Sequence, residues 1–346
     1  MNNSFFNSLM SFDYSSLYLS LISLIYLLLF VYFLFNESLV VAACLTISVL
    51  SSLFCFFTNN IVIFWLFYEL SILTLLYLIL FWSPYSDRYN AAWYLIGYIG
   101  ATSLPMLLLF YIFYFYNGHY FINESHLLNS YFSILLGILF LTKIPFPPFH
   151  SWLPIVHAEA STLVSMALSG YIMKLGLIGV YRFCYCNNFY IFYLYFLITF
   201  FICLIFFGSS IKELDYKRWL AYLSLAHIQI VGVGLTVVNE NNYDTIFLYS
   251  LGHGLSAILL FYLFNILSEG SGSRNWLLLQ NINNNSGVSL FILSLSLLTA
   301  ASFPVTMQFL VEVNILSSSI GSFFYCLLFY IFFLLGWYLY LYSLNV

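Results

Sequence analysis

The chain has 346 residues, of which 63% are hydrophobic and only 6% are charged. A soluble domain has about 25% charged residues, so the composition excludes an ordinary soluble protein and predicts an all-α polytopic membrane protein. Helices are favoured over a membrane barrel because the apolar runs are continuous and do not alternate at period two. The net charge of −4 argues against a nucleic-acid partner, which would require basic patches.

The apolar runs predict about eleven transmembrane helices joined by short loops. In chain order they fall near residues 15–35, 38–57, 60–82, 91–116, 130–157 (broken), 161–183, 189–210, 217–238, 243–267, 287–320 (broken) and 322–343. We expect a single transmembrane domain over residues 1–346, with pseudo-repeat halves near 38–183 and 189–343. The first fourteen residues contain no Lys or Arg, so we expect neither a secretory signal nor an Arg-rich transit peptide.

The first half contains a lone buried acid. Glu69 is the only charge in the run 60–82 and lies about ten residues into it. In the next helix, Gly97, Gly100 and Pro105 predict an interruption. A carboxylate in the middle of an apolar span is a functional-site candidate.

The first broken span contains a lysine at its break. A helix entering near Ser130 would bring Lys143 about 20 Å into the bilayer, where prolines between residues 145 and 148 stop the helix. A second helix starting near Ser161 would bring Lys174 to about the same depth. Broken helices at membrane depth require protein or water around their freed carbonyls, and in transporters they mark the working site.

The second half repeats the pattern with histidines and an acid. Charged residues near 215–218 open a helix that contains His227, and His253 lies in the middle of the next span. The run 287–320 is about 50 Å long as one helix, too long for a simple crossing. Pro304 provides a break, and Glu312 follows two turns later. One broken helix in each half is typical of an inverted-repeat transporter.

The buried charges admit two interpretations. Glu69, Lys143, Lys174 and Glu312 each cost about 2.5–3.5 kcal/mol at the bilayer centre. They could form structural salt bridges, although apolar residues usually serve packing as well or better. Lysines can instead change protonation when a neighbouring charge moves, which arginine cannot do. We therefore favour proton transfer.

The remaining polar residues have alternative roles. His227 and His253 are each either an interhelical hydrogen-bonding group or a proton carrier. We expect His150 and His157 to orient backbone at the break, and Glu159 to cap a helix start. The charged residues Asp215, Lys217 and Arg218 are expected to anchor their helix. The cysteines lack metal-ligand spacing, so we expect no metal site.

Loop charges predict the orientation. One face contains Arg88, Lys212, Lys217, Arg218 and Arg274, and the other contains only Arg182. The positive-inside rule places the first face and the C-terminus in the cytoplasm or matrix, and the N-terminus outside. The abundance of Phe, Tyr and Asn suggests an AT-rich genome, as organelles often have.

Several segments together resemble the proton-translocating antiporter-like subunits of respiratory complex I. The family pattern, roughly KxPxxxxHxWLPxAHxEAP…LLKxGxYGxxR, is similar to KIPFPPFHSWLPIVHAEA…MKLGLIGVYR, with the same 31-residue spacing from Lys143 to Lys174. Matching stretches are FYELSILTLLYLILFWSPYSDRYNAAWYL around Glu69, DYKRWLAYLSLAHIQ around His227 and LGHGLSAILLF around His253. The resemblance covers about residues 60–343. In FPVTMQFLVEVNIL, Glu312 stands where sister subunits usually have lysine.

The resemblance implies a set of site residues and the cofactors of the whole complex. Glu69 would be coupled to Lys143, and Lys174 would pass protons through His227 and His253 toward Glu312, as catalytic residues of a non-redox subunit of NADH:ubiquinone reductase. The chain itself would bind no cofactor, while the whole complex would contain FMN, iron–sulfur clusters and ubiquinone.

The same resemblance implies neighbours in the mitochondrial inner membrane. Expected partners are other membrane-arm subunits and phospholipids such as cardiolipin, with the N-terminus in the intermembrane space and the C-terminus in the matrix. Family members usually have about fourteen helices, so this chain would lack about two at its N-terminus and one at its C-terminus. Alternatives are a cation/proton antiporter subunit and a non-pumping structural subunit of the same complex.

Overall fold

The computed structural model describes residues 5–6, 9–33, 37–122, 130–184, 189–238, 242–276, 278–279, 287–304, 306–319 and 323–345. The chain divides into two compact units, Met1–Phe189 and Tyr190–Val346. In the described residues, 8 helices are long and apolar enough to cross a membrane, and further apolar helices are shorter. The predicted all-α polytopic fold is therefore confirmed. The proposed pseudo-repeat stays a prediction.

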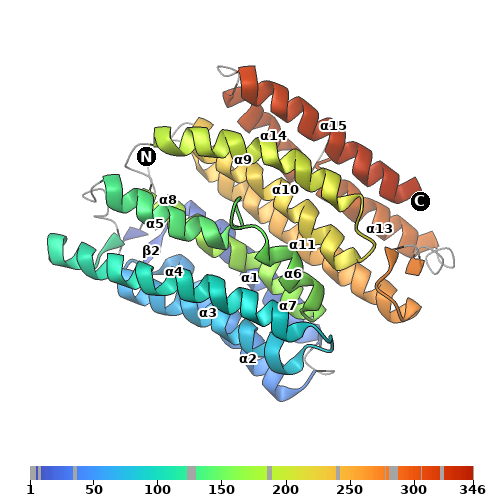
Figure 1. Ribbon diagram of the computed structural model, residues 1–346, viewed down its shortest axis with the longest axis horizontal. Coiled ribbons are helices and arrows are strands. Elements are labelled where there is room, and N and C mark those ends of the chain that lie inside the picture. The colour runs from blue at the N-terminus through green and yellow to red at the C-terminus, as the bar shows by residue number, and fades with distance from the viewer. Residues whose placement is uncertain are drawn as a thin grey trace. The chain divides into compact units, whose positions relative to one another are not determined.

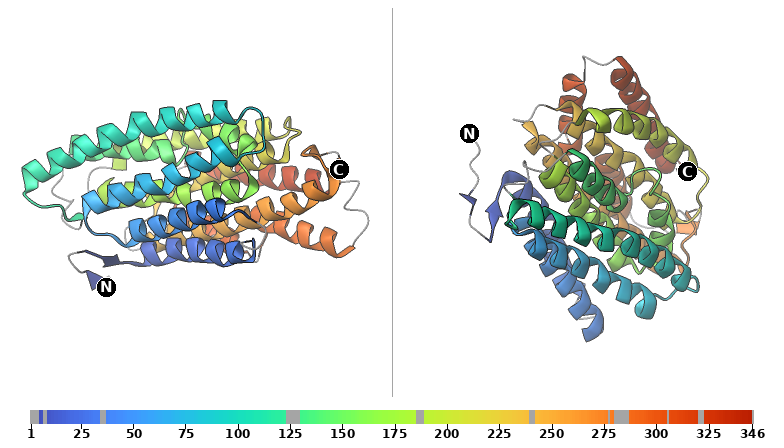
Figure 2. Two further views of the ribbon diagram at one scale, coloured as in Figure 1. Left: turned by 90° about the horizontal axis from the view of Figure 1, so that it is seen from below. Right: turned by 60° about the vertical axis from the view of Figure 1, so that its left-hand side comes forward.

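The first unit is a helical bundle preceded by a short hairpin. Strand β1 (Phe5–Phe6) pairs antiparallel with β2 (Ser11–Phe12). The helices that follow are α1 (Tyr14–Phe33), α2 (Leu39–Phe57), α3 (Ile61–Trp82), α4 (Arg88–Asn117), α5 (Ser130–Lys143), α6 (Trp152–Glu159), α7 (Thr162–Ala167), the π-helical turn η2 (Leu168–Ile172) and α8 (Met173–Cys184). Figure 1 and the left view of Figure 2 show α3 and α4 side by side.

Helix α4 differs from the sequence prediction. It is continuous over Arg88–Asn117, with Pro105 inside it, so the predicted interruption is wrong. One proline removes a single amide donor, and membrane helices absorb that loss by small local adjustments. The helix ends at Gly118, whose φ of 75° is the left-handed conformation of a glycine C-cap.

Close packing in the first unit depends on small residues of α8. Helices α5 and α8 pack against each other. A Cβ atom at Gly176 would lie 2.6 Å from Ile144 Cγ1 and 3.0 Å from the Phe140 carbonyl oxygen. A larger residue would thus push α8 away from the end of α5, which positions the first break against the helix of Lys174.

The second unit consists of α9 (Phe189–Ser210), α10 (Tyr216–Val237), α11 (Asp244–Ser271), α13 (Gly287–Ala300), α14 (Met307–Ser318) and α15 (Phe323–Asn345). Helix α10 is buried along nearly its whole length and packs against α11 and α14. In Figure 1, α9, α10 and α11 run alongside one another. Asp215 caps α10 by accepting from the Lys217 amide at 2.9 Å and pairs with Arg274 at 3.4 Å. Asp215 therefore contributes the predicted anchoring through the cap and the ion pair.

Both predicted breaks are present. Helix α5 ends at Lys143 and α6 begins at Trp152, so the prolines between them are outside regular helix. Helix α13 ends at Ala300 and α14 begins at Met307. Each unit thus contains one interrupted helix, and the ionisable residue lies at the end of α5 in the first unit and inside α14 in the second.

Candidate functional site

The first cluster of ionisable residues forms where α3 meets the end of α5. Glu69, Lys143 and Tyr68 are 6%, 5% and 0% exposed. The Lys143 ammonium lies 5.2 Å from the centroid of the Tyr68 ring, a cation–π distance. Glu69 and Lys143 are close enough to influence each other electrostatically, but no hydrogen bond joins them in the described residues.

The polar atoms of this cluster are buried without protein partners. Among the described residues, no hydrogen-bond partner reaches either carboxylate oxygen of Glu69, the Lys143 ammonium or the Tyr68 hydroxyl. Buried polar groups are almost always hydrogen-bonded, to protein or to ordered water. An ordered water molecule would satisfy each of these four buried atoms.

The break beside Lys143 is held by an indole. Prolines 145, 147 and 148 supply no amide hydrogens, which leaves carbonyls at the end of α5 without helical donors. The Trp152 indole Nε1 donates to the Thr142 carbonyl at 3.1 Å, with both residues buried. The first residue of α6 thus satisfies the last turn of α5 and keeps Lys143 in place.

Lys174 is anchored by the π-helical turn that precedes it. The lysine is 0% exposed, and its ammonium donates to the Ser169 carbonyl at 2.5 Å. Ser169 lies within η2 (Leu168–Ile172), where the hydrogen-bond pattern is i to i+5. Single π turns are frequently found at functional sites. Here the altered pattern lets a side-chain ammonium use a main-chain carbonyl within a fully buried helix.

The second unit contains the corresponding acid at its own break. Glu312 on α14 is 0% exposed. Its Oε1 accepts a hydrogen bond from the Ser302 hydroxyl at 2.6 Å, and Ser302 lies in the connection between α13 and α14. The break therefore supplies the hydrogen-bond donor for the carboxylate that follows it.

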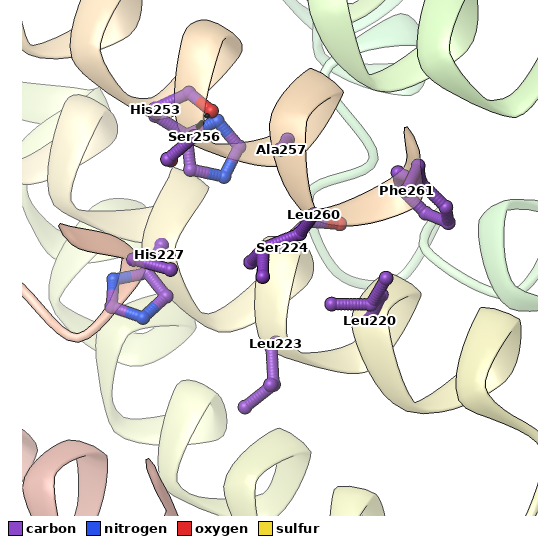
Figure 3. A pocket seen from close by; sticks show the side chains of 10 residues that line it. Leu220, Leu223, Ser224, His227, His253, Ser256, Ala257, Leu260 and Phe261 are labelled. Atoms are coloured by element: carbon purple, nitrogen blue, oxygen red, sulfur yellow. Dashed lines mark hydrogen bonds between the residues drawn. The ribbon is translucent and has the colours of Figure 1, made fainter. Parts of the chain in front are cut away.

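The two histidines meet around a small cavity in the same unit. His227 on α10 and His253 on α11 have ring centroids 6.4 Å apart. A cavity of about 20 Å³, enough for one water molecule, lies beside both rings (Figure 3). It is also lined by Ser224 and Ser256, while Leu220 and Phe261 lie on its far side from the histidines in Figure 3. One water here would connect the two imidazoles.

A tyrosine ties the histidine helices together. The Tyr249 hydroxyl donates to the His227 carbonyl at 3.2 Å, and its ring stacks on His253 with centroids 6.5 Å apart. Gly252 permits a further close contact, since a Cβ there would lie 2.9 Å from Gln308 Cγ on α14. Tyr249 and Gln308 thus join α10, α11 and α14 at the level of the histidines.

The structure brings the predicted site residues together as two groups. Glu69 and Lys143 share one cluster in the first unit, whose α8 holds Lys174. His227 and His253 meet in the second unit, which also contains Glu312 on a helix packed against theirs. The supporting residues Tyr68, Trp152, Ser169, Tyr249 and Ser302 were not predicted. Of these, Trp152 had a sequence signal, because it follows Pro148 by four residues.

One predicted structural role is wrong in position. Glu159 was expected at a helix start, but it is the last residue of α6, and Ser161 takes the N-cap position of α7. Its carbonyl accepts a hydrogen bond from the Ser83 hydroxyl, which ties α6 to the end of α3. Among the described residues, no group of three or more His, Cys, Asp or Glu side chains is arranged to hold a metal ion.

Comparison with protein families and individual relatives gives consistent matches. The family model described as "NADH:quinone oxidoreductase/Mrp antiporter, TM" matches residues 58–336. A relative named NADH-ubiquinone oxidoreductase chain 4 from Locusta migratoria is 34% identical over 299 residues, covering 81% of this chain and 65% of the relative. The protein of the same name from Caenorhabditis elegans is 26% identical over 266 residues, covering 75% and 63%.

Solved structures share the fold at low sequence identity. A chain in respiratory complex I from Thermus thermophilus with bound NADH aligns with a TM-score of 0.81 at 17% identity, covering 97% of this chain and 74% of that one. A chain of the Mrp complex from Dietzia sp. aligns with a TM-score of 0.81 at 16% identity, covering 96% and 66%. The chain spans between 59% and 65% of the length of the curated relatives.

Proposed function

Because the chain belongs to the NADH:quinone oxidoreductase/Mrp antiporter family of membrane proteins, we propose that it translocates protons as a non-redox membrane-arm subunit of respiratory complex I. The relatives named NADH-ubiquinone oxidoreductase chain 4 support the complex I branch of this family. In this proposal, NADH oxidation and ubiquinone reduction occur in other subunits and supply the energy. FMN, iron–sulfur clusters and ubiquinone are bound there as well.

The observation that carries the proposal is the Glu69–Lys143 cluster. A charged lysine and a glutamate at membrane depth are expensive, and a structural ion pair would place them in direct contact. Here the two charges influence each other but no hydrogen bond joins them, and their polar atoms are buried without protein partners in the described residues. This arrangement suits groups that exchange protons with water better than groups that only hold helices together.

The proposed mechanism changes access and proton affinity together. Moving a proton against the membrane potential requires about 2.3 kcal/mol per 100 mV. A displacement of Glu69 away from Lys143 removes the negative charge that favours the ammonium, so Lys143 releases its proton. The resemblance orders the later steps as Lys174, His227, His253 and Glu312.

The proposal includes a location and partners. We place the chain in the mitochondrial inner membrane, with the N-terminus in the intermembrane space, the C-terminus in the matrix, and residues near 38–183 and 189–343 as pseudo-repeat halves. Its partners are other membrane-arm subunits and phospholipids such as cardiolipin. In the described residues, large apolar side chains are exposed along α1 to α4, α9 and α15, which is the surface that lipid or apolar subunits would cover.

A second candidate function is a subunit of a cation/proton antiporter, which the fold similarity to the Mrp complex favours. The greater identity to relatives named for NADH-ubiquinone oxidoreductase argues against it. Purification of the native assembly separates the two: flavin and iron–sulfur subunits would accompany a complex I subunit. A third candidate, a non-pumping scaffold, would retain the assembly but tolerate loss of the buried charges.

Proton pumping by Lys143→Met and Glu69→Gln complexes tests the proposal. Reconstituted in vesicles, each is expected to translocate fewer protons per NADH oxidised while assembling normally. Lys212→Met, which removes a charge from an exposed lysine, is the matched control and keeps the normal ratio. Normal assembly with an unchanged ratio in both site variants would refute the proposal.

A further inference from the structure

Ser302 has an unusual backbone at the second break. Its φ is 54°, and it is the one residue other than glycine with a positive φ in the part of the chain that the structure describes. A side chain in this left-handed region is crowded by its own backbone, and glycine is the default residue there. An observed outlier of this kind points to a requirement for the side chain.

The side chain of Ser302 has a definite partner. Its hydroxyl donates to Glu312 Oε1 at 2.6 Å. Both residues are buried, so bulk water does not compete for the hydrogen bond between them. The Tyr249 hydroxyl also lies near this carboxylate. At hydrogen-bond distance, Oε1 has the Ser302 hydroxyl and Oε2 has no partner among the described residues, so Oε1 is held while Oε2 remains available for a proton.

The connection between the helices aims the hydroxyl. Ala301 and Ser302 continue the last turn of α13, with their amides donating to Leu297 at 2.8 Å and to Thr299 at 3.3 Å. The left-handed residue then turns the chain toward α14, which starts at Met307. The same backbone conformation that ends the helix thus presents the Ser302 side chain to a carboxylate ten residues later in sequence.

We propose that Ser302 is a positioning residue for proton transfer at Glu312, holding Oε1 so that Oε2 exchanges the proton. This inference rests on the proposed proton-translocating function. The helices packed against α14 contribute other titratable groups, among them His227 on α10, Tyr249 and His253 on α11, and Tyr325 on α15, and of these Tyr249 also lies near the Glu312 carboxylate. They are unchanged in the test below and act as a constant background.

The test compares Ser302→Gly with Glu312→Gln in the assembled complex. Glycine relieves the crowded backbone, so a purely structural role predicts equal or better assembly and normal pumping. A positioning role predicts normal assembly but altered pumping. Without the Ser302 hydroxyl, the carboxylate form of Glu312 loses a hydrogen bond and is less favoured over the protonated form. The pH of half-maximal pumping therefore rises by about one to two units. Ser302→Ala is expected to give the same shift.

The controls separate failure of this inference from failure of the function. Ser296→Ala removes a buried hydroxyl of α13 whose hydrogen bond among the described residues is to Leu293 of the same helix, and it is expected to keep the normal pH profile. In the Glu312→Gln background, Ser302→Gly is expected to have no further effect on pumping. Normal pumping by Glu312→Gln would refute the role of Glu312 itself.

Two results would overturn the positioning role alone. The first is a loss of pumping in Glu312→Gln together with an unchanged pH profile in Ser302→Gly and Ser302→Ala. The second is poor assembly of both serine variants with a normal profile in the complex that does form. Either result would make Ser302 a structural residue.

Discussion

Replacing Trp152 by phenylalanine tests how the first break is held. Phenylalanine keeps an aromatic ring at the start of α6 but removes the indole donor that reaches the Thr142 carbonyl at 3.1 Å. An unsatisfied buried carbonyl costs about 1–3 kcal/mol. The population of locally opened states at the break should therefore rise by about 5- to 150-fold.

Hydrogen–deuterium exchange reports this opening directly. The amides of Ile144 and Phe146 bond to carbonyls of the last turn of α5, each at 3.3 Å, and would exchange faster in the Trp152→Phe complex. The matched control is Trp65→Phe, which removes a similar indole bond to the Ser103 carbonyl in a part-buried place. Exchange at Ile144 and Phe146 that stays within about twofold of normal would show that the indole does not hold the break.

Three further predictions concern packing and protons. Gly176→Ala should lower stability by about 1–3 kcal/mol through overpacking, whereas Gly208→Ala, with open space around its Cβ, should raise it by about 0.5–1 kcal/mol; thermal denaturation of the complex measures both. Lys174→Arg should abolish its proton transfer because arginine stays protonated, so normal pumping would contradict a carrier role. Tyr68→Leu should impair pumping more than Tyr68→Phe, since only leucine removes the ring beside Lys143. Equal impairment by both variants would assign the role to the hydroxyl.

Much of the fold was predictable because membrane helices have a strong sequence signal. A span must be apolar over about twenty residues, so a lone Glu69 or Lys174 stands out, and prolines after Lys143 mark a break. Pro105 was misleading because a single missing amide hydrogen does not end a membrane helix when the neighbouring turns adjust.

The supporting residues were not predictable because their roles depend on tertiary distance. Ser302 and Tyr249 are ordinary residue types, and nothing local indicates that one reaches Glu312 and the other the His227 carbonyl. The π-helical turn that precedes Lys174 also has no recognisable sequence signal. Charge in an apolar run identifies candidate site residues, whereas the hydrogen bonds that orient them arise only when helices distant in sequence meet.

The π-helical turn Leu168–Ile172 also sets the angular register of everything after it in the same helix. A π turn accommodates one more residue than an α turn, and each residue rotates the following side chains by about 100°. If the same residues formed a regular α-helix, Lys174 would swing round by about 100°, whereas deleting one residue from the turn would keep it on the same side. The direction in which this lysine points therefore depends on the turn remaining π-helical.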